Sequence, residues 1–185
     1  MTRESLVKWT GLANIVAGVG TALFWFIHPD PSLLNLSLRG AALWKIDYGI
    51  FLAVLVLTLF ALVGMLSKQI ERINPLGVVG YILAFTGTAI LIGAGTFEGV
   101  GGIIFALGYI LFGSFIIQAR IFPPLAGILL IIGGPILGLS PAMPPIARMI
   151  GSVIFGLANI WLGSSLWCSD SSCCCSGEKG QCCRG

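Results

Sequence analysis

Six cysteines between positions 168 and 185 are the densest group of side chains that could do chemistry in this sequence. Thiolates are soft ligands that suit zinc or copper(I), but these cysteines lack the C-x-x-C spacing of zinc knuckles and ferredoxin clusters. A zinc or copper site, S-acylation of a cytoplasmic tail, disulfides on an outward-facing tail and a tail without ligand all stay open. The six are Cys168, Cys173, Cys174, Cys175, Cys182 and Cys183.

Four polar side chains, Asn14, Asn159, Lys45 and Asp47, fall within long apolar stretches. Polar groups inside a membrane are unfavourable unless paired, so these positions are the first candidates for function. We expect Asn14 and Asn159 to form hydrogen bonds between helices, with a substrate site as the alternative. We expect Lys45 and Asp47 to reach the headgroups rather than pair, because residues two apart in a helix point to different sides.

The triplet Gly133, Gly134 and Pro135 predicts a break in an otherwise apolar helix. Proline removes a backbone donor and should kink or loosen the helix near its middle. In a transporter, such a break exposes backbone groups to a solute. In a scaffold, it only lets a neighbouring helix approach.

The sequence contains no arrangement typical of an enzyme. Its single histidine, His28, stands at a predicted helix end beside prolines. The H-E-x-x-H, G-x-S-x-G and Walker motifs and paired intramembrane carboxylates are all missing from the sequence. We therefore expect a protein that is not an enzyme and has no cofactor other than a metal in the tail.

The composition predicts a membrane protein. Hydrophobic residues make up 57% of the chain and charged residues 9%, whereas soluble domains carry about 25% charged residues. The apolar stretches approach twenty residues without alternation, which favours helices over a β-barrel. The fold class expected is an all-α polytopic transmembrane bundle of about six helices. The net charge of +3 is too small and too scattered for nucleic-acid binding.

Prolines, glycines and short charged loops divide the chain into six predicted helices and a tail. The helices cover residues 6–27, 41–66, 75–97, 103–118, 124–139 and 145–167, and the connection at 98–102 is predicted to be a loop. Residues 1–167 form the transmembrane domain, and residues 168–185 form a cysteine-rich tail.

The distribution of lysine and arginine predicts the orientation in the cell membrane. With the N-terminus inside, the inner segments carry Arg3, Lys8, Lys68, Arg72, Arg120, Lys179 and Arg184. The outer segments then carry Arg39, Lys45 and Arg148. By the positive-inside rule, this asymmetry places both termini in the cytoplasm.

Small residues and one repeated run stand out within the helices. The pairs Gly95 with Gly99 and Gly134 with Gly138 have the spacing typical of close helix contact. The run G-L-A-N-I occurs at residues 11–15 and again at 156–160, on helices predicted to run in opposite directions. Tandem duplication does not explain that arrangement, so we expect a chance similarity.

The middle of the chain resembles a loose group of small, uncharacterised prokaryotic multi-pass membrane proteins. The similar runs are 108–113, 119–127 and 131–134, together with the N-terminal stretch from Trp9 to Pro29. The resemblance covers roughly residues 5–165 and implies no activity. The function expected is that of an accessory or scaffold subunit in the bilayer, associated with other membrane proteins or with itself. The alternative is a small-solute or ion transporter or channel.

Overall fold

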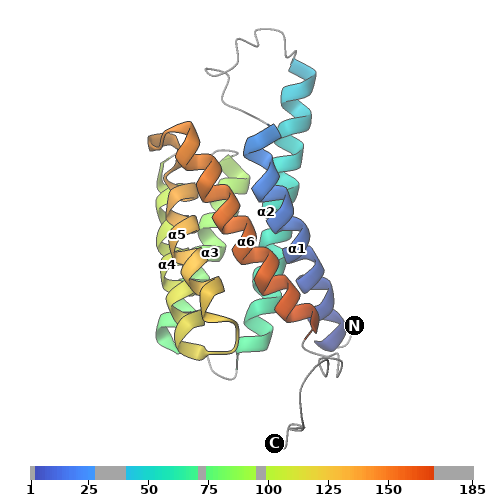
Figure 1. Ribbon diagram of the computed structural model, residues 1–185, viewed down its shortest axis with the longest axis vertical. Coiled ribbons are helices and arrows are strands. Elements are labelled where there is room, and N and C mark those ends of the chain that lie inside the picture. Colours follow the sequence, from blue (N-terminus) through green and yellow to red (C-terminus); the bar gives the residue numbers. More distant parts are fainter. Residues whose placement is uncertain (1–2, 28–40, 71–73, 95–98, 169–185) are drawn as a thin grey trace, which may run out of the picture.

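The computed structural model describes residues 3–27, 41–70, 74–94 and 99–168, and these are almost entirely helical (Figure 1). In α2, side chains are described from Gly49 onward. The elements are α1 Arg3–Ile27, α2 Ala41–Gln69, α3 Pro75–Ala94, α4 Val100–Ala119, α5 Pro124–Gly138, the short 3-10 helix η1 Ser140–Ala142 and α6 Pro145–Cys168. The predicted all-α bundle is confirmed.

Local sequence signals set the helix ends. Three helices begin with a proline, at Pro75, Pro124 and Pro145. Proline suits this position because the first helical N–H has no partner within the helix. The Asn74 side chain caps α3 by accepting a hydrogen bond from the Gly77 N–H at 2.8 Å. Helix α4 ends where Arg120 takes a left-handed conformation, with φ of 52°. From α2 onward, each helix is followed within about six residues by the next one, so these sequential helices lie antiparallel (Figure 1).

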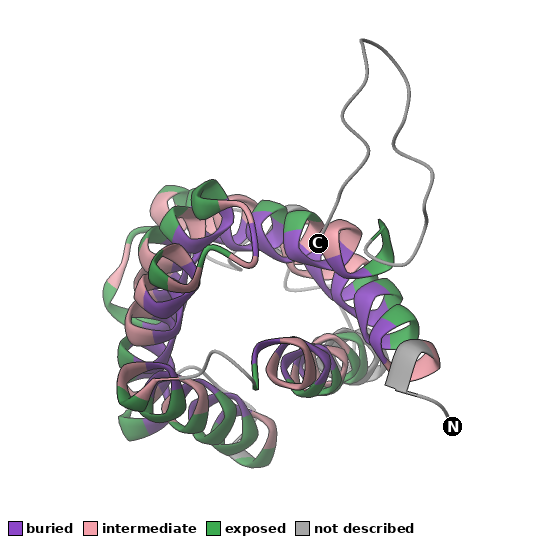
Figure 2. Ribbon diagram, turned by 90° about the horizontal axis from the view of Figure 1, so that it is seen from below, coloured by how far each residue is buried: buried purple, intermediate pink, exposed green. Residues whose placement is uncertain are grey.

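The six helices surround a common interior (Figure 2). Each helix contacts the next one in the chain, and α1 also contacts α6, which closes the ring. The α1–α6 contact is the most extensive of all the helix pairs, whereas α2 and α3 touch least among sequential neighbours. The start of α1 and the end of α6 lie at the same end of the bundle (Figure 1).

Four glycines bring α1 and α6 into direct backbone contact. A Cβ atom added to Gly11 would lie 2.9 Å from the Gly163 carbonyl oxygen, and one added to Gly163 would lie 2.6 Å from the Gly11 oxygen. Gly18 and Gly156 face each other in the same reciprocal way, at 2.6 and 2.5 Å. The runs 11–18 and 156–163, which share G-L-A-N-I, therefore pack antiparallel on one another. The similarity that we expected to be chance has a packing role.

Glycines also set the contacts of α4 with α3 and α5. A Cβ at Gly80 of α3 would lie 2.6 Å from the Phe112 backbone nitrogen of α4. Gly113 of α4 and Gly127 of α5 face each other reciprocally, each 2.7 Å from the other's carbonyl oxygen by the same measure. Gly138 packs against the Gly102 carbonyl oxygen. Close packing of this kind holds helices together in lipid, where hiding apolar surface gains nothing.

The two predicted close-contact spacings differ in outcome. Gly134 and Gly138 both lie against α4, as their spacing predicts. Gly99 instead makes the turn into α4, with φ of 67°, and a Cβ there would meet nothing within 4 Å. Gly95 lies outside the described residues. Because the turn is completed at Gly99, residues 100–102 belong to α4, and the predicted loop at 98–102 is wrong for them.

Five helices, α1, α2, α3, α4 and α6, are long and apolar enough to cross a membrane. Helix α5 has 15 residues, about 22 Å at 1.5 Å per residue, which is shorter than a hydrocarbon core of about 30 Å. The prediction of six helices is confirmed, and five of the six meet the length for a membrane span.

Replacing Gly156 with alanine should lower the free energy of unfolding by about 1–3 kcal/mol, because the added methyl group meets backbone atoms that cannot move aside. Gly49→Ala is the matched control, since a Cβ there meets nothing within 4 Å. The control should leave stability unchanged or raise it by about 0.5–1 kcal/mol. SDS titration followed by circular dichroism measures both. Equal effects at the two positions would contradict the α1–α6 contact.

Candidate functional site

The two asparagines lie at nearly the same depth inside the bundle. Asn14 is 0% and Asn159 is 1% exposed. Because Gly11 faces Gly163 across antiparallel helices, residue 14 of α1 lies level with residue 160 of α6, next to Asn159. The register set by the glycine contact thus places these two side chains at nearly the same level along the bundle axis.

The hydrogen bonds of the asparagines differ from our expectation. The Asn159 Nδ2 donates to the Phe155 carbonyl oxygen at 2.8 Å, within α6. Both amide atoms of Asn14 are buried without a partner. The predicted bonds between helices are therefore wrong for these side chains as described. A carbonyl four residues earlier in the same helix can accept a bond from an asparagine, as the Phe155 carbonyl does from Asn159, whereas an interhelical bond needs matched positions on two helices.

Most of the other polar candidates lie outside the residues whose side chains the structure describes. Lys45 and Asp47 fall in the first two turns of α2, before the described side chains begin, so their contacts stay a prediction. Cys168 ends α6 as an exposed free thiol. The remaining tail cysteines and His28 lie outside the described residues. In the part of the chain that the structure describes, no three His, Cys, Asp or Glu side chains gather to hold a metal.

The triplet at 133–135 is packed rather than open. Helix α5 continues through Pro135, which lies near its C-terminal end, so the predicted interruption near mid-helix is wrong. A Cβ at Gly133 would lie 2.7 Å from the Phe155 backbone nitrogen of α6. One at Gly134 would lie 2.6 Å from the Tyr109 Cβ of α4. Neighbouring helices on both sides therefore occupy the space that these glycines leave.

Three aromatic rings that we did not single out from the sequence pack together in the interior of the bundle. The ring centroids of Phe105 and Tyr109 are 4.5 Å apart, and the Phe155 ring lies 5.6 and 4.8 Å from them. The Tyr109 hydroxyl is buried beside Thr88, without a hydrogen bond of good geometry. The spacing of four between Phe105 and Tyr109 puts them on one face of α4, but α6 supplies the third ring.

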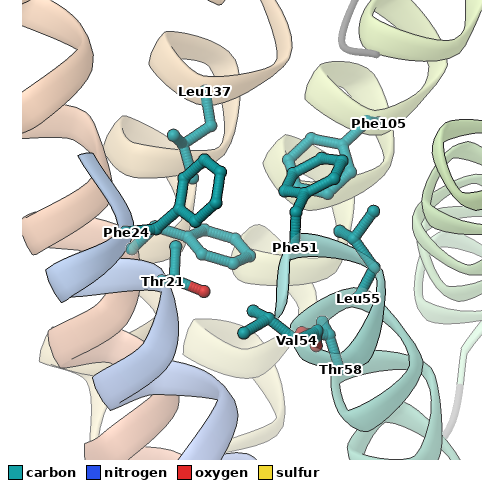
Figure 3. A pocket seen from close by; sticks show the side chains of 9 residues that line it. Thr21, Phe24, Phe51, Val54, Leu55, Thr58, Phe105 and Leu137 are labelled. Atoms are coloured by element: carbon teal, nitrogen blue, oxygen red, sulfur yellow. The ribbon is translucent and has the colours of Figure 1, made fainter. Parts of the chain in front are cut away.

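A small cavity lies beside this cluster, between α1, α2, α4, α5 and α6 (Figure 3). Its accessible volume is about 20 Å³. The rings of Phe24 and Phe51 lie 5.4 Å apart at its edge. The cavity is lined by Thr21, Phe24, Phe51, Val54, Leu55, Thr58, Phe105, Leu137 and Phe155.

The cavity wall offers little polar chemistry. Its two hydroxyl groups already donate within their own helices, Thr21 to the Ala17 carbonyl at 2.8 Å and Thr58 to the Val54 carbonyl at 2.9 Å. The remaining lining side chains are apolar. The described lining residues include no carboxylate, amine, imidazole or thiol, so the arrangement suits packing or an apolar guest. Comparison with protein-family models, curated proteins and solved structures finds no match for this chain.

Asn14→Leu should leave the free energy of unfolding unchanged or raise it by about 1–3 kcal/mol, because it removes a buried polar group without a partner. Asn159→Leu is the matched comparison on α6 and should lower stability by about 0.6 kcal/mol through loss of its hydrogen bond. SDS titration of both variants gives the difference. A larger loss in Asn14→Leu than in Asn159→Leu would show that Asn14 has a bonding partner.

Proposed function

We propose that this chain is a non-catalytic integral membrane protein that serves as an accessory or scaffold subunit of a larger membrane complex. Its partners are other membrane proteins or further copies of the chain. The packing of Gly133 and Gly134 supports this proposal. Neighbouring helices fill the space beside these two glycines, where a transporter would need a path for a solute.

The polarity of the interior supports the same proposal. Among the described residues, the buried polar side chains are all uncharged: Thr10, Asn14, Thr58, Gln69, Thr88, Ser140, Ser152 and Asn159. Transporters of ions and polar solutes usually carry charged groups or discontinuous helices at the midplane. In the described part of the chain, the interior holds aromatic rings, glycines and uncharged polar groups, and no charged side chain is buried there.

Pro135→Ala separates the scaffold from the transporter. Alanine restores a backbone donor to the last turns of α5, so the variant should be as stable as the wild type or more stable. If the protein is a scaffold, wild type and variant reconstituted in proteoliposomes should both give no flux above protein-free vesicles. Flux through the wild type that disappears in a folded Pro135→Ala variant would contradict the proposal.

The partner is tested on the chain in its native membrane. After extraction into polymer-bounded lipid discs, native mass spectrometry should give particles heavier than the 19.5 kDa chain, with fixed stoichiometry. Treatment with a harsher detergent should release the single chain and lower its thermal stability. A single chain in the native discs would contradict a subunit role.

We further propose that both ends of the chain face the cytoplasm of a cell membrane. The start of α1 and the end of α6 share one end of the bundle (Figure 1). Lys8, Lys68 and Arg120 belong to helix ends on that side, whereas Arg148 lies at the other end, in the first turn of α6. This distribution follows the positive-inside rule.

Labelling of single cysteines tests this orientation. With the six native cysteines replaced by serine, a membrane-impermeant thiol reagent added to whole cells should label Ala142→Cys and spare Gln118→Cys. Both positions are exposed and lie at opposite ends of the bundle. Lysed cells should show labelling of both. The reverse pattern in whole cells would invert the orientation.

A further inference from the structure

We infer that the cavity between α1, α2, α4, α5 and α6 is a binding site for a linear alkyl chain, supplied by the acyl chain of a bilayer lipid. This inference goes beyond the proposed subunit role and does not depend on it. It rests on where the cavity lies, on how α2 is packed beside it, and on the polarity and size of the cavity.

The cavity lies toward the end of the bundle opposite the start of α1. Thr21 and Phe24 belong to the last two turns of α1, and Leu137 is the next-to-last residue of α5. Phe105 lies in the second turn of α4, which starts at the same end. All these residues belong to apolar helices, so hydrocarbon surrounds this part of the bundle in a membrane.

A lipid chain can reach the cavity beside the first described turns of α2. Its described residues from Gly49 to Val54 are exposed or only half-buried, and Leu55 is the first that is buried. The contact between α2 and α3 is also the least extensive among sequential helices. Phe51 and Val54, which line the cavity, lie in this part of α2 (Figure 3), where Val54 packs against Gly20 of α1. A lipid chain that lies along α2 on the side facing α3 therefore reaches the cavity without crossing the closer contact between α1 and α2.

The polarity of the wall selects an apolar guest. A buried water needs two to four polar partners. Among the described lining residues, Thr21 and Thr58 are the polar side chains, and each hydroxyl already donates its proton to its own helix. Four phenyl rings and three aliphatic side chains form the rest of the lining. An alkyl chain gains contact with these groups and needs no hydrogen bond.

The small volume of the cavity favours a linear alkyl chain over a ring-shaped molecule. An engineered cavity that takes up benzene measures roughly 150 Å³, and this one measures about 20 Å³. A ring does not enter such a space unless the helices move. A linear chain enters one methylene at a time and can occupy the cavity with a short segment, while the rest of the chain stays in the bilayer.

Photolabelling tests this site on the full chain. The protein is reconstituted in vesicles of phosphatidylethanolamine and phosphatidylglycerol that contain a phosphatidylcholine with a diazirine part-way along one acyl chain. After irradiation, mass spectrometry should find adducts on the cavity residues, above all Phe51, Phe105 and Phe155. Adducts confined to outward-facing side chains such as Val56 and Ile82, which are 52% and 53% exposed, would overturn the inference. A cavity that holds water or is closed gives that result.

Two variants of opposite effect make the test specific. Thr21→Leu fills the cavity and should reduce adducts on Phe105 and Phe155 at least fivefold. Val19→Leu is the matched control on the outward face of α1, where Val19 is 43% exposed, and should leave those adducts unchanged. Leu137→Ala enlarges the cavity and should raise them at least twofold, which decides the matter if Thr21→Leu does not fold. If the amount of adduct on Phe105 and Phe155 does not change when these substitutions shrink or enlarge the cavity, the inference is overturned.

Discussion

The rest of this structure depends on direct backbone contact between α1 and α6 at two pairs of glycines. In lipid, helices gain little by hiding apolar side chains from one another, so association depends on how closely they approach. The pairs Gly11 with Gly163 and Gly18 with Gly156 place carbonyl oxygens where any side chain would stand. The glycines on each helix are seven positions apart, about two turns, so both pairs fall on one face and fix the register of the first and last helices.

This register decides what meets inside the ring. It places Asn14 and Asn159 at nearly the same depth. Neither side chain forms a hydrogen bond to the facing helix, since Asn159 bonds within α6 and the Asn14 amide has no partner. Together with the glycine contacts of α4 and α5, it brings Phe155 of α6 onto Phe105 and Tyr109 of α4. The first turns of α2 with described side chains are less tightly held, and the cavity lies beside them.

The proposed subunit role and the inferred lipid chain draw on different parts of this arrangement. The subunit role follows from an interior whose buried polar side chains, over the described segments, carry no charge. The inference of a bound lipid chain follows from one small apolar cavity, which lies beside the least buried part of α2. A bound alkyl chain would complete the packing there without adding any polar chemistry. Both proposals treat the molecule as a packing element in the bilayer.

The sequence by itself determined the helices, because runs of about twenty apolar residues broken by proline, glycine and charge leave few other choices in a membrane. It located the start of α3, α5 and α6 at prolines and identified Asn14 and Asn159 as buried polar groups. It did not show that Gly101 and Gly102 belong to α4, since one positive φ at Gly99 completes the turn. Nor did it show that the triplet at 133–135 continues a helix.

Only the tertiary structure decided which helices are partners. Glycines occur in every helix, and their spacing along one helix does not say which neighbour fits against it. The repeated G-L-A-N-I run held part of the answer, but its meaning depends on the antiparallel contact of the chain's first and last helices. The aromatic cluster and the cavity likewise need residues from distant helices at one depth. Depth and facing direction are set by interhelical register, which no single stretch of sequence contains.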